Sequence, residues 1–589
     1  MNITEYKLSS VLRRNYRGFV VGAVLVVMTV CIQLGMPFIV RHLIDELTVG
    51  NLTRRELLAW VAFYAACIPP AAAISYWMRR LPLRNGHKVE YTIRRDLFEH
   101  LSRQDAAFYN QNRIGDLMTR SSTDIALVRD ALGHGILHGT RALISLLLAF
   151  SVLSRMHVAL AAVLLGLMLC MLFSFSLLLG VIRRRHAKLQ EQTSHLGSVV
   201  EETFSGIRTI KGFALEQLRN RMFAGENDEL RNCSMRLSLV SEPIWPLFAF
   251  WFALQMTVTL VYGGRLVLDQ AITLGDLVLV TQYLLFMQWP VLSLGWISNM
   301  LQRARISWGR VQALFSAVPQ IRDTEKTDFS ITALQGGIEF RNVSLRLGGR
   351  TVLDGISLKI PAGMTVGITG PTGAGKSLLT ALVARLCEPD EGAVLIDGHP
   401  LERIPLAVLR QHIGFVPQQP ILFSDTLAHN LAFGVDDASD EQIAAAARIA
   451  CLEDEIKVFP KGYATMIGER GVTLSGGQRQ RAALGRAVAR QAAILVLDDA
   501  LAAVDTHTEA SIIGQLESFT SGRTTLLVSH RLAALYRADQ IVVLSNGRIT
   551  EQGTHAELLA VGGYYAETYR LQQLEAGAVP ADAREGRLS

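Results

Sequence analysis

Long apolar segments in the first half of the chain constrain its fold more than any other feature of the sequence. Each is close to the ~20 residues that a helix needs to cross a bilayer. A backbone in lipid must satisfy its own hydrogen bonds, so such segments fold as helices. They cover residues 18–40, 57–77, 136–153, 158–182, 244–263 and 274–296. The sequence therefore predicts six membrane-spanning helices, the first of which is a span and not a cleavable signal peptide.

Basic residues gather beside these segments. They precede the first span and follow the second and the fourth, whereas the third and fourth spans are joined by a short turn. They are Arg13, Arg14, Arg17, Arg79, Arg80, Arg84, Lys88, Arg94, Arg95, Arg183, Arg184, Arg185 and Lys188. The positive-inside rule places these connections, the N-terminus and the second half of the chain in the cytosol. It also accounts for the net charge of +6, so we expect no nucleic acid partner.

The long cytosolic connections have helical periodicity and few glycine or proline residues. We expect them to continue the spans as helices far into the cytosol. Residues 1–320 are therefore predicted to form an α-helical transmembrane domain with long cytosolic helix extensions.

Several polar side chains fall inside the predicted spans. A polar group in lipid is costly unless it faces another helix or water, so each is a candidate for a cavity or an interhelical hydrogen bond. His138 and Arg141 share one face of a helix, which could meet an anionic headgroup or substrate, or could lie in a cytosolic extension of the third span. The other candidates are Gln33, Gln255, Gln282 and Gln288.

The second half of the chain changes to short apolar runs separated by glycine-rich turns. Residues 338–343, 352–360 and 365–369 are predicted strands, and the last runs into a loop that fits the GxxxxGK[ST] pattern of phosphate-binding loops. The loop consists of Gly370, Pro371, Thr372, Gly373, Ala374, Gly375, Lys376 and Ser377. An α/β phosphate-binding-loop NTPase domain is therefore expected over residues 330–573, followed by a C-terminal tail over 574–589.

This loop predicts a nucleoside triphosphate site with a metal ion. The glycines allow backbone N–H groups to surround phosphates at a helix N-terminus, while Lys376 reaches the β and γ phosphates and Ser377 binds Mg²⁺. The apolar strand 494–498 ends in Asp498, whose carboxylate can hold the same Mg²⁺.

An LSGGQ segment, residues 474–478, lies between these two elements and resembles the signature of the ATP-binding cassette (ABC) family. Gln418 in VPQQPILF resembles the Q-loop of that family, Asp505 in AAVD the D-loop, and His530 in LLVSHRLAAL the switch histidine. Residues 112–124 and 200–213 resemble the cytosolic loops that couple its two halves. The resemblance covers nearly the whole chain and implies an exporter-type half-transporter with six spans and one cassette.

The resemblance also implies ATP and Mg²⁺ as ligands, and a second half-transporter as partner. In this family two cassettes pair head to tail, and each signature closes over the other's ATP. Gln418 is implied to contact Mg²⁺ and, with His530, to sense the γ-phosphate. The signature residues that would bind the partner's ATP are Ser475, Gly476, Gly477 and Gln478. The resemblance implies that the chain lies in the bacterial inner membrane, in contact with its lipid. It also implies export of a small molecule, lipid or peptide, as in exporters of the multidrug type.

Two residues depart from the family pattern. Asp499 stands where the family has the glutamate that acts as base, and the carboxylate is drawn back by roughly 1.5 Å, a displacement that can cost about 10²-fold in rate. Leu347 stands where an aromatic ring is expected to stack on adenine, with a loss of about 1 kcal/mol. A subgroup of the family pairs such an aspartate chain with a competent partner. We therefore expect a heterodimer in which this chain carries the weakly hydrolytic site.

Three alternatives remain open on the sequence. A homodimer could tolerate aspartate as the base. An importer of exporter shape, for example one that takes up metal chelates, would have the same architecture. A regulator that gates a channel or signals to a partner would bind ATP without moving a substrate, because fold alone does not decide function.

Overall fold

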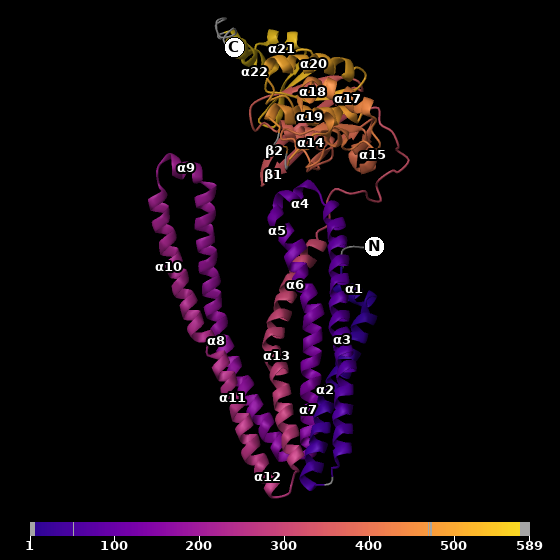
Figure 1. The fold of residues 1–589 in the computed structure, drawn as a ribbon. Helices are drawn as coiled ribbons and strands as arrows, with labels where there is room; N and C mark the ends of the chain where they lie inside the picture. Colours follow the sequence, from indigo (N-terminus) through magenta and orange to yellow (C-terminus); the bar gives the residue numbers. More distant parts are fainter. Residues whose placement is uncertain (1–5, 51, 469–470, 472–473, 578–589) are drawn as a thin grey trace. The chain divides into compact units, whose positions relative to one another are not determined.

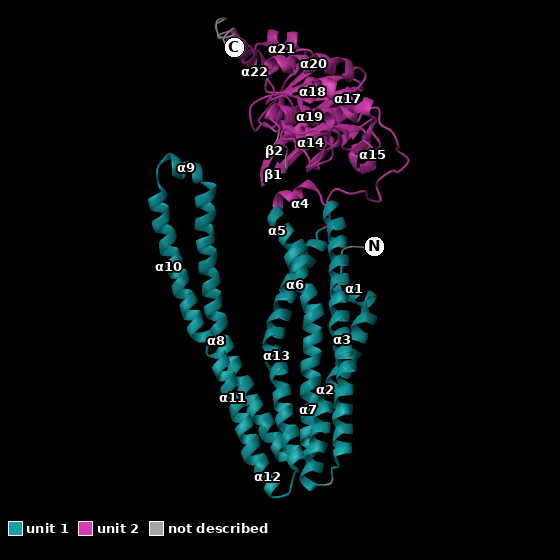
Figure 2. Ribbon diagram, viewed as in Figure 1, with its two compact units in different colours: residues 1–102, 114–317 teal, residues 103–113, 318–589 magenta. Residues whose placement is uncertain are grey.

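The computed structural model describes residues 6–50, 52–468, 471 and 474–577, and the chain divides into two compact units (Figure 1; Figure 2). Unit 1 comprises Met1–Ser102 and Ile114–Ala317, and unit 2 comprises Arg103–Arg113 and Val318–Ser589. The last helix runs to Gly577, a few residues into the predicted tail. The rest of the tail, 578–589, lies outside the described residues.

Unit 1 is helical, and the described residues contain six helices that are long and apolar enough to cross a membrane. They are Tyr16–Val49, Arg54–Ser102, Ile114–Met156, Val158–Ser205, Glu216–Leu268 and Leu274–Phe315. All exceed the ~20 residues that a bilayer requires. Both the six spans and their long helical extensions are therefore confirmed.

Some of these spans consist of several helical segments. The helices of unit 1 are α1 (Leu8–Arg14), α2 (Tyr16–Val49), α3 (Arg54–Ser102), α5 (Ile114–Thr119), α6 (Ile125–Asp130), α7 (Ile136–Met156), α8 (Val158–Ser205), α9 (Ile207–Gly212), α10 (Glu216–Ser241), α11 (Ile244–Val258), α12 (Gly264–Leu268) and α13 (Leu274–Phe315). Single π-helical turns at Arg120–Asp124, Ala131–Gly135 and Thr259–Gly263 interrupt the third and fifth spans without ending them.

Helices α2, α7 and α13 pack together around the apolar core of unit 1, and α3 packs along α2. Tyr283 of α13 is fully buried in this core, where its hydroxyl donates to the carbonyl oxygen of Leu34 on α2 at 2.7 Å. A capping box at Thr273 and Asp276 starts α13, and Arg41 of α2 pairs with Asp276 at 2.7 Å. The first turns of α13 are thus held against α2 by an ion pair and a buried hydrogen bond.

Helix α10 packs along α8, and the two form an extended hairpin closed by α9 (Figure 1). None of the residues of α10 is buried. Its exposed apolar side chains are Leu218, Met222, Phe223, Met235 and Leu239. We call α8 and α10 the long hairpin. A helix of this length with no buried residue obtains little stability from packing within its own chain.

Unit 2 contains two sheets. The strands are β1 (Ile338–Leu347), β2 (Arg350–Ile360), β3 (Thr365–Thr369), β4 (Glu391–Ile396), β5 (His399–Pro400), β6 (Ile413–Val416), β7 (Ile494–Asp498), β8 (Thr524–Val528), β9 (Gln540–Ser545) and β10 (Arg548–Gly553). An antiparallel sheet has the order β2-β1-β4-β5, and a six-stranded sheet has the order β10-β9-β3-β8-β7-β6. Within the second sheet β9, β3, β8, β7 and β6 are parallel, and β10 is an antiparallel edge.

The helices of unit 2 complete an α/β fold. They are α4 (Ala106–Gln111), α14 (Lys376–Val383), α15 (Leu406–Gln411), α16 (Leu427–Ala432), α17 (Asp440–Ile449), α18 (Glu453–Val458), α19 (Gly476–Ala489), α20 (Thr506–Thr520), α21 (His555–Val561) and α22 (Tyr564–Gly577). One apolar core joins both sheets to α14, and a second joins α16, α17 and α19 to β6 and β7. The predicted α/β phosphate-binding-loop cassette is confirmed.

Helix α4 belongs to unit 2 although it lies between two spans in the sequence. Asp105 caps α4 by accepting from the N–H of Phe108 at 2.9 Å, and its second oxygen accepts from the N–H of Gln320 at 2.9 Å. One carboxylate therefore joins the connection between the second and third spans to the linker that precedes the cassette.

Candidate ATP site

The order of the parallel strands collects the predicted nucleotide residues at one edge of the sheet. The carboxyl ends of adjacent parallel strands meet at the same edge. The glycine-rich loop follows β3, Asp498 ends β7 and Asp499 comes directly after it, His530 follows β8, and Gln418 follows β6. The four elements thus come from four consecutive strands of the sheet, whereas Leu347 comes from β1 of the other sheet.

The glycines of the loop are required by its close contacts with neighbouring backbone and side chains. Gly370 has φ +141°, and a Cβ there would lie 2.0 Å from the carbonyl oxygen of Leu544. Gly375 has φ +99°, and a Cβ would lie 2.7 Å from Cδ2 of Leu353. At Gly373, φ +83°, nothing lies within 4 Å, so this part of the loop faces open space. The loop is a backbone cradle of the kind that accepts phosphates.

Lys376 begins α14 and is buried, with its ammonium donating to the carbonyl oxygens of Gly370 at 2.8 Å and Pro371 at 2.9 Å. Burial lowers the pKa of Lys376, and the negative charges of Asp499 and Asp498 oppose that change. The ammonium group is thus held over its own loop by two backbone carbonyl oxygens.

Ser377 and Asp498 meet across the sheet, with the serine hydroxyl donating to the carboxylate at 3.1 Å. Burial raises the pKa of Asp498. The hydrogen bond from Ser377 lowers this pKa in part, and the negative charge of Asp499 raises it further. A hydroxyl and a buried carboxylate are oxygen ligands that Mg²⁺ accepts beside nucleotide phosphates. The donor set therefore fits ATP with Mg²⁺.

Asp499 adopts a left-handed backbone with φ +49°. Its N–H donates to the carbonyl oxygen of Val528 on β8 at 3.0 Å, and its side chain is half-buried. Aspartate tolerates this conformation better than most residues. The position is therefore anchored through its backbone, and the reach of its carboxylate is set by its single methylene.

The other three predicted contacts with nucleotide are exposed. Gln418 lies in a bend after β6, and His530 lies in the loop after β8, where it acts electrostatically on Asp498. Leu347 is 50% exposed at the end of β1, paired with Arg350 across the hairpin. An exposed leucine offers an apolar surface but no ring.

The LSGGQ segment forms the start of α19. Ser475 is the N-cap, with its hydroxyl accepting from the N–H of Gln478 at 3.2 Å and its own N–H donating to the Gln478 side chain at 2.8 Å. The N–H groups of Gly476 and Gly477 are the first of the helix and have no acceptor within it. They remain available to an anion from outside the helix.

Several residues of the site were not identified from the sequence. Gln480 is buried, accepts from the N–H of Ala503 at 2.8 Å and donates to the carbonyl oxygen of Asp499 at 3.5 Å, so it links the signature helix to the segment after β7. Arg531 donates to the carbonyl oxygens of Val504 at 2.8 Å and Ala502 at 3.3 Å. Only the burial of a polar side chain identifies Gln480, and burial is not visible in the sequence.

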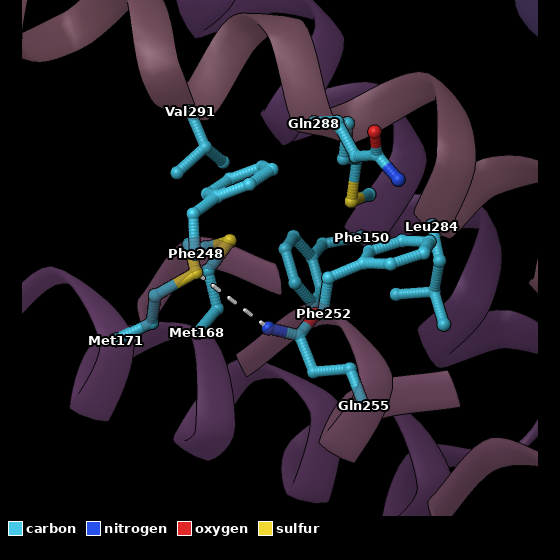
Figure 3. A pocket seen from close by; sticks show the side chains of 10 residues that line it. Phe150, Met168, Met171, Phe248, Phe252, Gln255, Leu284, Gln288 and Val291 are labelled. Carbon is cyan, nitrogen blue, oxygen red and sulfur yellow. Dashed lines mark hydrogen bonds between the residues drawn. The ribbon is translucent and has the colours of Figure 1, made fainter. Parts of the chain in front are cut away.

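The membrane unit contains a pocket between α7, α8, α11 and α13 (Figure 3). Phenylalanine and methionine side chains line it together with two of the predicted glutamines. These are Phe150, Met168, Met171, Phe248, Phe252, Gln255, Leu284, Met287, Gln288 and Val291. The amide of Gln255 donates to the sulfur of Met171 at 4.0 Å. The volume of the pocket, about 20 Å³, is far below the roughly 300 Å³ of a ligand pocket, so the lining side chains nearly fill it.

Comparisons with known proteins agree along the whole chain. Residues 19–291 match the ABC transporter transmembrane region, and residues 353–502 match the ABC transporter domain. The chain is 33% identical over 99% of its length, and 98% of the relative, to the multidrug resistance-like ATP-binding protein MdlA of Escherichia coli (strain K12). It is 31% identical over 95% of its length, and 92% of the relative, to an ATP-dependent lipid A-core flippase of Syntrophus aciditrophicus (strain SB).

A solved structure is similar over nearly the whole fold. The structure of a bacterial Atm1-family ABC exporter with ATP bound has a TM-score of 0.80 and 28% identity, covering 96% of this chain and 99% of that chain.

Proposed function

The chain belongs to the ABC transporter family, as an ATP-driven exporter half-transporter of the multidrug or lipid type, and from this membership we propose that it works as one half of an unequal pair. It is a multi-pass membrane protein with a cytoplasmic cassette. Half-transporters of this family act as dimers. In our proposal the partner is a different half-transporter with a competent catalytic carboxylate, and this chain carries the weakly hydrolytic site.

The observation that carries the proposal is Asp499, directly after Asp498 and beside an intact LSGGQ segment. Its N–H donates to the carbonyl oxygen of Val528 on β8, which holds the backbone of Asp499 against the sheet. A carboxylate withdrawn by roughly 1.5 Å positions water poorly, and about 10²-fold in rate can be lost. The chain's own site then binds ATP and hydrolyses it slowly.

Each predicted residue has a distinct part in this mechanism. The loop N–H groups and Lys376 bind the phosphates, with Lys376 exchanging its loop carbonyls for the β and γ oxygens. Ser377 and Asp498 would hold Mg²⁺, with Gln418 as a further ligand, and the bound ion would supply positive charge beside the phosphates. His530 contacts the γ-phosphate. Asp499 is the weak base, and Leu347 lies against the adenine without stacking.

The signature of this chain serves the partner's site. Ser475, Gly476, Gly477 and Gln478 present a hydroxyl and two unpaired N–H groups at a helix N-terminus, which suits the γ-phosphate of an ATP bound by the other cassette. ATP binding closes the pair, and the extended helices transmit closure to the membrane cavity. We further propose the boundaries 1–320 for the transmembrane domain, 330–573 for the cassette and 574–589 for the tail.

Two alternative functions receive less support. Uptake is not favoured, because the relatives above are named for multidrug resistance, lipid flipping and export. A regulator without transport is excluded when substrate moves against a gradient in proportion to ATP hydrolysed. The transported molecule is a small amphipathic compound, a lipid or a peptide.

The first test is the mass of the intact complex, purified from its native host through a tag on this chain. A mixed dimer with a second half-transporter is expected. In that dimer Asp499→Asn should barely change ATPase activity, whereas replacing the partner's catalytic glutamate should abolish it. A dimer of this chain alone, in which Asp499→Asn stops hydrolysis, would overturn the proposal.

A further inference from the structure

Arg141 lies on α7, in the half of the predicted third span that is nearer the cytosol. With a rise of about 1.5 Å per residue, it is about 8 Å along the helix from the predicted start of that span at residue 136 and about 18 Å from its predicted end at Leu153. A permanently charged side chain at that depth must face water, a counter-ion or a ligand.

The structure supplies Arg141 with a neutral partner. Its Nη2 donates to the side-chain oxygen of Gln33 on α2 at 3.1 Å. Across the described part of the chain, no ion pair involves Arg141, His134 or His138. Two other arginines of unit 1 have a carboxylate partner: Arg41 pairs with Asp276 at 2.7 Å, and Arg129 with Glu90 at 3.1 Å.

Other basic and aromatic groups surround this position. The rings of His134 and His138 stack with centroids 6.1 Å apart, and His138 meets the edge of Trp296 on α13 at 5.7 Å. Arg79 of α3 lies close enough to act electrostatically on both His138 and Arg141. Trp296 is 47% exposed, so this group of side chains has an open aromatic side.

We propose that Arg79, His134, His138 and Arg141 form a subsite that binds the anionic group of an amphipathic substrate. A carboxylate, sulfate or phosphate would accept charge-assisted hydrogen bonds from the guanidinium groups, and Trp296 would contact the adjoining apolar part. The same charges disfavour cationic amphiphiles, which would meet like charge without a carboxylate to neutralise it. An anionic amphiphile would then be the substrate class of this transporter. This inference rests on the transport function proposed above, but it holds whether the two chains of the dimer are the same or different.

A purely structural role for Arg141 would be the hydrogen bond between α2 and α7. Arg141→Gln keeps an amide that can bond to Gln33 and removes the charge, whereas Arg141→Lys keeps the charge. Arg155→Gln is the matched control, because Arg155 lies exposed in the last turn of the same helix, away from the cluster.

The test measures binding to the full chain in nanodiscs of phosphatidylcholine, without ATP. The probe is dansylaminoundecanoic acid, and its uncharged methyl ester is the comparison, with saturable energy transfer from tryptophan as the signal. We expect the acid to bind more tightly than the ester. Arg141→Gln should weaken binding of the acid about ten- to hundredfold. Arg141→Lys and Arg155→Gln should weaken it much less. Because ATP is absent, the measured binding does not depend on ATP hydrolysis at either site of the dimer.

Phosphatidylglycerol in the nanodisc then distinguishes the source of the anion. Displacement of the probe by this lipid supports the subsite with lipid headgroups as occupants, and no displacement supports it with a free amphiphile. Equal binding of acid and ester, or equal losses in Arg141→Gln and Arg155→Gln, would overturn the proposal. If Arg141→Gln does not fold, Arg79→Gln takes its place. It is expected to weaken binding of the acid several-fold and to leave binding of the ester unchanged.

Discussion

The side-chain amide of Gln572 holds the backbone on both sides of Arg531, directly after His530. Its Nε2 donates to the carbonyl oxygen of His530 at 2.8 Å, and its Oε1 accepts from the N–H of Leu532 at 2.9 Å. Gln572 lies on α22, whereas His530 follows β8. The C-terminal helix therefore fixes the loop that carries the predicted γ-phosphate contact.

Gln572→Ala should shorten the residence of ATP at this chain's own site. Two neutral hydrogen bonds contribute about 1 kcal/mol each, so the loss is expected to be roughly three- to thirtyfold. The release rate of a fluorescent ATP analogue from the full complex measures it. Gln573→Ala, at an exposed neighbouring position, is the control. In a His530→Ala background Gln572→Ala should add nothing, and a further loss there would contradict a positioning role.

Asp498→Asn should stabilise the nucleotide-free cassette at neutral pH. Burial raises the pKa of Asp498, so the fold favours the protonated acid and loses stability as the pH rises through that pKa. An asparagine removes this loss, and the unfolding midpoint should rise by about 3 °C at pH 8 and hardly at all in acid. Thermal melts of the full chain from pH 5 to 8, without Mg²⁺ or ATP, measure it.

The control for this prediction is Asp505→Asn. The N–H of Thr508 holds the pKa of Asp505 below its ordinary value, so no gain is expected at pH 8. A stabilised Asp505→Asn, or an increase in melting temperature from Asp498→Asn that is the same at pH 5 and at pH 8, would contradict the argument.

Gly477→Ala should destabilise the cassette, whereas Gly476→Ala should not. A Cβ at Gly477 would lie 2.9 Å from the carbonyl oxygen of Ala503, a backbone atom that must shift. At Gly476 the nearest atom is the Cβ of Ala503 at 3.5 Å, an ordinary contact. We expect a cost of about 1 to 3 kcal/mol for Gly477→Ala alone. Chemical denaturation of the two variants side by side measures the difference.

Asp105→Ala should uncouple ATP hydrolysis from transport. It removes both the cap of α4 and the bond to the N–H of Gln320, at a cost in stability of about 1 kcal/mol from the lost cap. ATPase activity should persist while substrate movement into vesicles falls several-fold. Asp228→Ala on α10, which removes an exposed ion pair with Arg231 outside the two predicted coupling loops, should leave both activities unchanged.

Much of the fold follows from local patterns. The membrane spans are defined by their length and apolarity, which depend on nothing outside the segment. The loop around Gly375 and Lys376 is defined by backbone requirements that glycine meets almost alone. A strand that ends in Asp498 is read from an apolar run and its terminal carboxylate. These elements were therefore predicted correctly from the sequence.

The contacts between distant segments were not predicted. Arg141 and Gln33 both stood out as polar residues in spans, but their pairing depends on how α2 and α7 pack. Gln572 lay near the end of the predicted cassette with no motif around it. Residues 103–113 lie between two spans in the chain, and only packing assigns them to unit 2. Each of these depends on tertiary geometry, for which a single sequence carries no local signal.

The long hairpin is expected to make the unassembled chain susceptible to degradation. Its second helix exposes apolar side chains near both of its ends and has no buried residue. Such a surface is what chaperones and proteases recognise in unassembled subunits. In the unequal pair proposed above, the cellular amount of this chain should therefore follow the supply of its partner, and a surplus of it should be degraded first through this hairpin.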